Sequence, residues 1–269
     1  MPSTFRAIVA SLVVVAFAGS SCGSDDAGPA ATAVTTATTA AAPTATGDVV
    51  VFAASSLTEA FTEMGTAFSA ANPGATVTFN FAGSGDLVTQ IGQGAPADVF
   101  VSADDSNMKK LTDASEAAGD PVAIAKNSME IIVEQGNPKA IATVADLAKP
   151  GTVVVLCADT VPCGKNAAKV LTNAAVTLTP ASFEDKVKGV VTKVSAGEAD
   201  AGIVFVTDVI AAGDAAAGVE IPPDLNVTSN YPIVVTKEAT NPAAARAFVE
   251  FVAGETGRAI LAEHGFLAP

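Results

Sequence analysis

The order of hydrophobic and polar positions predicts strands alternating with helices from residue 48 to the C-terminus. Residues 49–53 form a continuous apolar run, which is typical of a strand buried on both faces. Apolar residues at helical spacing follow between Leu57 and Phe68, and the run from Ser56 to Glu59 has the pattern of a capping box at the start of that helix. Alternation of this kind predicts an α/β protein with mostly parallel sheets flanked by helices.

The same alternation continues along the rest of the chain. We expect further strands at 76–81, 98–101, 129–133, 153–156 and 201–206. We expect helices directly after residue 84 and at 144–148, 164–174, 183–195, 243–252 and 256–263. Sheets of this type bind ligands at the carboxyl ends of their strands, so the strand-to-helix junctions are where a site is expected.

The first 47 residues lack this pattern and are typical of an exported protein held at a membrane. Residues 1–21 resemble a signal peptide, because Arg6 precedes an apolar run that is too short to span a membrane stably. Small residues lead to Cys22, as in a lipobox, although Gly19 replaces the usual Leu. This predicts lipidation of Cys22 and anchoring at the cell membrane, with an ordinary cleaved signal peptide as the alternative. Residues 22–47, rich in Ala, Thr, Pro and Gly, predict a flexible tether.

Composition narrows the chemistry. The chain has 269 residues, of which 49% are hydrophobic. Its formal net charge is −14, and this acidity argues against nucleic acid as a partner. It contains one His, one Tyr and no Trp, which leaves little material for zinc sites or imidazole-dependent catalysis. We therefore expect that the protein is not an enzyme; a surface hydrolase that uses Ser84 and His264 is the alternative from a different class.

Two serines stand at the first two strand-to-helix junctions. Ser56 follows the first strand and Ser84 follows the second. Helix starts present unpaired N–H groups and the positive end of the helix dipole, so two such starts facing one cleft could hold an anion. The structural alternatives are that Ser56 only caps its helix and that Ser84 is a polar loop residue.

Five segments resemble the periplasmic molybdate-binding proteins of ABC transporters. They are 48–58 (DVVVFAASSLT), 81–87 (FAGSGDL), 94–103 (GAPADVFVSA), 161–164 (VPCG) and 197–205 (GEADAGIVF), followed near the C-terminus by Gly265 and Phe266. The resemblance implies a type II periplasmic-binding-protein fold, in which two α/β lobes are joined by two hinge crossings. By that analogy, lobe 1 would comprise 48–125 and 230–269, lobe 2 would comprise 126–229, and the crossings would lie near Ala125 and Tyr231.

The resemblance also implies a set of ligand-binding residues. The hydroxyls of Ser56 and Ser84 and the backbone N–H groups of Cys163 and Val187 would bind the oxyanion, so that molybdenum is held as molybdate through Ser56, Ser84 and Val187. The family uses a tyrosine where this chain has Phe205, so one hydrogen bond to the ligand is missing or is supplied by another group.

The function implied is capture of molybdate or tungstate for the membrane permease and ATPase of an ABC importer. We expect a monomer that needs no cofactor besides this ligand. A sulfate or phosphate receptor of the same fold is the alternative, and phosphate would need Asp86 as a hydrogen-bond acceptor. With Cys22 assigned to lipid, Cys157 and Cys163 form the natural disulfide pair in an oxidising compartment, and two free buried thiols are the alternative.

Overall fold

The computed structural model describes residues 45–269. The predicted signal peptide, Cys22 and residues 22–44 of the predicted tether lie outside the described residues. Within 45–269, no helix is both long and apolar enough to cross a membrane. One boundary is corrected, because Thr46 and Gly47 belong to the first strand rather than to the tether.

The described residues form strands and helices in alternation. The strands are β1 (Thr46–Ala54), β2 (Gly74–Ala82), β3 (Val99–Val101), β4 (Val122–Glu134), β5 (Val154–Cys157), β6 (Ser182–Glu184), β7 (Ala201–Phe205), β8 (Ala216–Glu220) and β9 (Thr228–Val235). The α-helices are α1 (Thr58–Ala71), α2 (Ser84–Gly92), α3 (Asp105–Asp113), α4 (Pro162–Asn173), α5 (Val187–Ser195), α6 (Val206–Ala212), α7 (Pro242–Ala253) and α8 (Glu255–Glu263). Short 3-10 helices are η1 (Ser55–Leu57), η2 (Val144–Ala148) and η3 (Gly213–Ala215).

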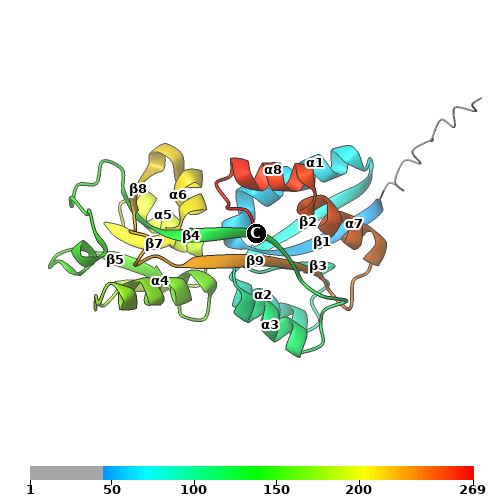
Figure 1. The fold of residues 1–269 in the computed structure, drawn as a ribbon, viewed down its shortest axis with the longest axis horizontal. Helices are drawn as coiled ribbons and strands as arrows, with labels where there is room; N and C mark the ends of the chain where they lie inside the picture. The colour runs from blue at the N-terminus through cyan, green and yellow to red at the C-terminus, as the bar shows by residue number, and fades with distance from the viewer. Residues whose placement is uncertain (1–44) are drawn as a thin grey trace, which may run out of the picture. The chain divides into compact units, whose positions relative to one another are not determined.

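The strands run in the order β2-β1-β3-β9-β4-β7-β5-β6, with β8 also paired to β4. Strand β4 pairs with β9 along its first half and with β7 and β8 along its second half, so it passes from one lobe into the other (Figure 1). The two-lobed α/β fold expected from the sequence is confirmed. The sheets are more mixed than expected, because β4 and β9 run antiparallel to all their neighbours while β1, β2 and β3 are parallel.

The crossing is a two-stranded ribbon made by β4 and β9. Ala125 and Tyr231, the two positions where the chain is expected to change lobe, are partners in its ladder. In Figure 1 the two strands lie side by side between the lobes, β4 in green and β9 in orange. A residue in the middle of this ribbon can therefore contact groups of either lobe.

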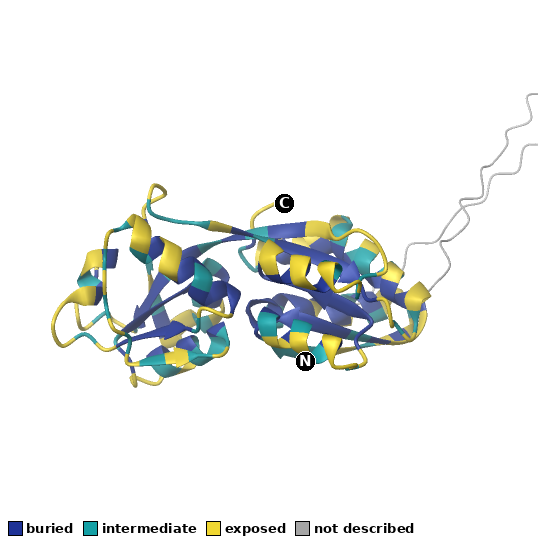
Figure 2. Ribbon diagram, turned by 90° about the horizontal axis from the view of Figure 1, so that it is seen from below, coloured by how far each residue is buried: buried dark blue, intermediate teal, exposed yellow. Residues whose placement is uncertain are grey.

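The apolar strand predicted at 49–53 is the centre of lobe 1. Val49, Val51 and Ala53 have no exposed surface, and α1 covers them with Phe61 and Phe68. Figure 2 shows the same arrangement, with buried strands beneath helices that expose only their outer faces. This packing fixes the carboxyl end of β1, and with it the position of the first serine junction.

Three sequence predictions are corrected. The capping box is wrong: Ser56 lies in η1, helix α1 begins at Thr58, and no side chain caps that helix. The helix expected at 183–195 begins only at Val187, because residues 182–184 pair with β5 as β6. The pattern also missed α3, α6, β8 and β9.

Candidate anion-binding site

A small cavity lies where the helix starts of the two lobes meet. The structure brings together all five predicted ligand-binding residues, Ser56, Ser84, Cys163, Val187 and Phe205, in its lining. The rest of the lining consists of Ala54, Ser55, Ala82, Gly83, Ala103, Val161, Pro162 and Lys186.

The cavity is surrounded by the N-termini of helices. The N-cap residues of η1, α2, α4, α5 and α6 all line it: Ala54, Gly83, Val161, Lys186 and Phe205. None of these five helix starts has a side-chain cap, whereas α3 and α7 are capped by Asp104 and Asn241. The first N–H groups of a helix have no partner within it, so uncapped starts around one cavity leave donors and dipole ends for an anion.

Ser84 is held by one hydrogen bond that leaves its hydroxyl proton available to the cavity. It is fully buried at the start of α2, and its Oγ accepts a hydrogen bond of 3.1 Å from the Ala103 backbone N–H. Because a backbone N–H cannot accept, the single Ser84 proton stays free for another partner. The alternative that Ser84 is a polar loop residue is wrong, because Ser84 is the first residue of α2.

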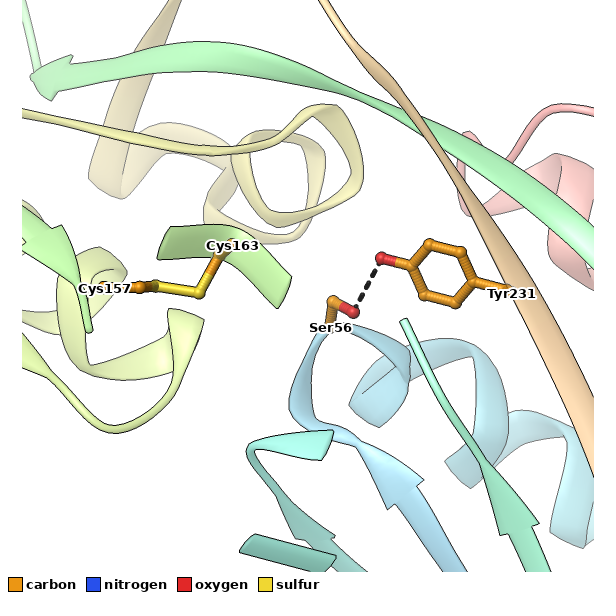
Figure 3. The surroundings of a disulfide bond; sticks show 4 residues. All are labelled: Ser56, Cys157, Cys163 and Tyr231. Atoms are coloured by element: carbon orange, nitrogen blue, oxygen red, sulfur yellow. Dashed lines mark hydrogen bonds between the residues drawn. A yellow bond between two sulfur atoms is a disulfide. The ribbon is translucent and has the colours of Figure 1, made fainter. Parts of the chain in front are cut away.

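Ser56 is also engaged from behind the cavity. Its Oγ lies 2.9 Å from the Tyr231 hydroxyl, and Figure 3 shows the two side chains pointing toward one another. Tyr231 is completely buried, and burial raises the pKa of its hydroxyl well above the ordinary value. The hydroxyl therefore stays protonated. Sequence reasoning placed Tyr231 at a crossing but missed this contact, although its being the only tyrosine of the chain was a usable signal.

The second lobe supplies backbone groups and an apolar wall. Cys163 and Val187 stand in the first turns of α4 and α5, where backbone N–H groups lack helical partners. Phe205 ends β7, and its buried ring packs edge-on against Tyr231 with centroids 5.8 Å apart. Lys186, which the sequence analysis missed, is the only cationic residue among those lining the cavity.

The lining of the cavity contains no carboxylate among the described residues. Asp86, the acid that a phosphate site would need, is exposed on α2 and is not part of the lining. No group of three or more His, Cys, Asp or Glu residues within 45–269 could hold a metal ion. The cavity is thus rich in donors and lacks an obvious charged acceptor.

Two ion pairs join the lobes on either side of the cavity. Lys165 of α4 donates to Asp104 at 2.9 Å and to Ser106 at 2.7 Å. Lys188 of α5 binds both carboxylate oxygens of Glu59 on α1, at 2.9 and 2.8 Å. These contacts cross between residues of the first and second lobes, so they exist only when the lobes are close together.

Lys188 also faces a buried carboxylate within its own lobe. Its Nζ lies 3.2 Å from Asp208 Oδ1, a distance that makes an ion pair although the geometry departs from that of a hydrogen bond. Asp208 has no exposed surface, and this burial raises its pKa to about 6 despite the neighbouring lysine. Burial alone would lower the pKa of Lys188, but the Asp208 and Glu59 carboxylates outweigh it and raise that pKa.

The groups needed by the hydrolase alternative are not brought together. His264 ends α8, and its Nε2 lies 2.9 Å from Glu63 Oε2 on α1. Ser84 is instead bonded to the Ala103 backbone, and no hydrogen bond links it to His264 within the described chain. The arrangement of a nucleophile beside a general base is therefore not found there.

A disulfide links Cys157, at the end of β5, to Cys163 in the first turn of α4, with Cα atoms 5.8 Å apart (Figure 3). The bond closes the loop that leads into α4, where Cys163 is one of the residues lining the cavity. We expect the denatured but unreduced protein to show no free thiol at these two positions in alkylation followed by mass spectrometry. Alkylation of both cysteines before reduction would contradict the pairing, and labelling after reduction is the internal control.

The chain belongs to the bacterial extracellular solute-binding protein family, whose model matches residues 49–267. It is 44% identical over 221 residues to the molybdate-binding protein ModA of Mycobacterium tuberculosis, a match covering 82% of this chain and 85% of that protein. A structure of the substrate-binding domain assigned to a molybdenum ABC transporter of Clostridium difficile matches with a TM-score of 0.63 and 31% identity, covering 82% and 99% of the two chains. The periplasmic molybdate-binding protein of Azotobacter vinelandii matches in fold, with a TM-score of 0.73, 22% identity and coverage of 82% and 99%.

Proposed function

We propose that this protein is the extracytoplasmic substrate-binding component of an ABC importer and captures molybdate or tungstate between its lobes. The observation that carries the proposal is the convergence of five uncapped helix starts on a small cavity lined by Ser56 and Ser84. The relatives named for molybdate binding support the same ligand. The bound anion would be released to a membrane permease driven by its ATPase.

The chemistry of the ligand fits the donors. Molybdate and tungstate are fully deprotonated dianions at neutral pH, so they accept hydrogen bonds and donate none. Ser56 and Ser84 would donate their hydroxyl protons, and the N–H groups of Cys163 and Val187 would donate from the opposite lobe. Phe205 would close the pocket without a hydrogen bond of its own.

Phosphate is a poorer fit than a full dianion. Hydrogen phosphate keeps one proton at neutral pH and therefore needs an acceptor in its site. Asp86 would have to supply it, but this residue is exposed and outside the lining. Sulfate has the charge and shape of molybdate but shorter bonds, and it is the competitor to be compared in titrations.

Closure of the lobes would be stabilised by the two interlobe ion pairs. The Lys165–Asp104 and Lys188–Glu59 contacts lie on elements that flank the cavity. A ligand that binds donors from both lobes stabilises the closed conformation but not a conformation in which the lobes are separated. The anion would thus shift the population toward the closed form.

We further propose that the mature chain is a lipoprotein anchored through Cys22 and held away from the membrane by the tether. The support is the signal-like residues 1–21 ahead of Cys22 and the composition of 22–44. Mass spectrometry of the N-terminal peptide from a native membrane fraction tests this. A peptide beginning with diacylglyceryl-modified Cys22 is the expected product, and an unmodified one would contradict the anchor.

The proposed function is tested by titrating the protein with molybdate, tungstate, sulfate and phosphate in a calorimeter. A ligand held by the folded protein stabilises it by about 2.7 kcal/mol at a hundredfold excess over its Kd, so molybdate should raise Tm. Ser56→Ala and Ser84→Ala should each weaken molybdate binding by about 1.5–3 kcal/mol, the value of a hydrogen bond to a charged group.

Ser69→Ala is the matched control, because Ser69 lies on α1 and does not line the cavity. It should bind molybdate as the parent protein does. Unchanged binding in both Ser56→Ala and Ser84→Ala would show that the site lies elsewhere. Tighter binding of phosphate than of molybdate would favour the phosphate receptor.

A further inference from the structure

The only tyrosine of the chain lies directly behind the proposed ligand site. Tyr231 stands on the crossing strand β9, has no exposed surface and does not line the cavity. Its hydroxyl reaches Ser56 Oγ at 2.9 Å (Figure 3). Tyr231 therefore acts on the site through Ser56, and the direction of this hydrogen bond decides what Ser56 can offer a ligand.

A neighbouring amide sets that direction. Asn127 Oδ1 accepts a hydrogen bond of 3.0 Å from the Ser128 N–H, which places the amide nitrogen on the other side. That nitrogen donates to Thr207 Oγ1 at 2.8 Å and faces the Tyr231 hydroxyl oxygen at 3.5 Å. The second contact is long, but an amide NH₂ can only donate, so it favours Tyr231 as an acceptor on that side.

A hydroxyl has a single proton, and besides Ser56 the Tyr231 hydroxyl has one hydrogen-bond partner within residues 45–269, which is Asn127. With Asn127 on its acceptor side, the Tyr231 proton is left for Ser56 Oγ. Ser56 then accepts from Tyr231, so its own proton must point elsewhere. Ser56 lines the cavity, which is the open side of the residue.

Ser84 has the same arrangement, in which its oxygen accepts a hydrogen bond, but the donor is a backbone N–H. The Ala103 N–H donates to Ser84 Oγ at 3.1 Å, which leaves the Ser84 proton free for another partner. Tyr231 thus does for Ser56 what the Ala103 N–H does for Ser84. Both serines are engaged as acceptors from behind and present donors in front.

We propose that Tyr231 is a positioning residue that donates to Ser56 Oγ, turns the Ser56 proton into the cavity and so selects fully deprotonated tetrahedral dianions over anions that carry a proton. This inference rests on the proposed function and deepens it. An anion that is still protonated would direct its proton at a hydroxyl that already points its own proton into the cavity. Molybdate, tungstate and sulfate carry no proton and avoid this conflict.

The first test is a double-mutant cycle read by calorimetric titration with molybdate and with inorganic phosphate at neutral pH. Tyr231→Phe keeps the ring and removes the hydroxyl, and it should weaken molybdate binding about tenfold, as expected for one hydrogen bond. Phosphate binding should fall by less than about twofold or improve, because the Ser56 hydroxyl is then free to rotate and to turn a lone pair toward the proton of phosphate. In a Ser56→Ala background, Tyr231→Phe should change molybdate affinity less than about twofold, since the residue through which it acts is gone.

A matched control separates this role from simple packing. Thr236→Val also removes a buried hydroxyl, one that donates to the Ala97 carbonyl just beyond the end of β9. It should lower Tm but leave molybdate affinity unchanged. If Tyr231→Phe instead weakens molybdate binding equally with and without Ser56, Tyr231 supports only the fold and the inference is overturned.

The second test needs no ligand. Because the chain has one Tyr and no Trp, its near-ultraviolet tyrosine absorption reports Tyr231 alone. A phenol that donates a hydrogen bond absorbs at longer wavelength than one that accepts, so Ser56→Ala should move the band to shorter wavelength. Movement to longer wavelength would mean that Ser56 donates to Tyr231, and it would overturn the inference.

The two tests separate the inference from the proposed function. A parent protein that binds none of the four oxyanions contradicts the proposed function, while the absorption measurement still decides the direction of the Tyr231–Ser56 bond. A parent protein that binds molybdate, with a Tyr231→Phe variant that keeps both affinity and selectivity, contradicts the inference alone.

Discussion

Replacing Gly83 with Val is expected to weaken molybdate binding by more than about 100-fold, or at least about 3 kcal/mol. Gly83 is the N-cap residue of α2, and its φ of −63° suits any residue, so the need for glycine is one of space. A Cβ there would lie 2.6 Å from the Asp185 carbonyl oxygen and 2.6 Å from Val161 Cγ1, both in the opposite lobe. A side chain would hold the lobes apart and keep their donors from reaching one anion.

Gly92→Val provides the matched control for this result. Gly92 is at the other end of the same helix, and a Cβ added there would meet nothing within 4 Å. Calorimetric titration should show the loss in Gly83→Val and near-parental affinity in Gly92→Val. Small-angle X-ray scattering with excess molybdate should show a more compact particle for the parent and for Gly92→Val only. Parental affinity in Gly83→Val would contradict the requirement for lobe contact at α2.

The second large effect concerns pH and the buried carboxylate of Asp208. Burial raises its pKa to about 6 from an unfolded value of 3.8, so the folded state binds the proton more tightly than the unfolded state. The contribution of Asp208 to the free energy of unfolding is therefore highest below pH 4 and falls as pH rises toward 6. A difference of this size between folded and unfolded pKa values corresponds to about 3 kcal/mol.

The asparagine of Asp208→Asn cannot titrate. The folding stability of this variant should therefore not show the decline with rising pH that Asp208 causes in the parent. In urea unfolding between pH 4 and 7, its stability relative to the parent should rise by up to about 3 kcal/mol, whatever constant offset the lost ion pair with Lys188 introduces. Lys188 keeps its contacts with Glu59 in this variant. The exposed Asp224→Asn serves as the control and should run parallel to the parent. Parallel curves for Asp208→Asn as well would show that Asp208 has no raised pKa.

The sequence determined the class of fold and where the candidate ligand site would lie. The apolar run at 49–53 becomes the buried strand β1, and the junctions carrying Ser56 and Ser84 become helix starts facing one cavity. These features are local or short-range, since a buried strand and a following helix are specified by neighbouring residues. The donors at Cys163 and Val187 followed only from resemblance, because no local pattern marks which helix starts will meet.

Only the tertiary structure decided how the donors are arranged and controlled. Ser56 has the sequence of a helix cap, yet its hydroxyl binds Tyr231, 175 residues away, because β9 returns through the crossing beside β4. Lys186 lines the cavity and Gly83 lies against Asp185 because the two lobes pack together, which brings residues far apart in the sequence into contact. Such contacts depend on where the chain crosses between sheets, which the sequence between the contacting residues does not encode locally. The contacts that orient each serine hydroxyl thus depend on the tertiary structure, while the positions of the serines at the strand ends are given by the sequence.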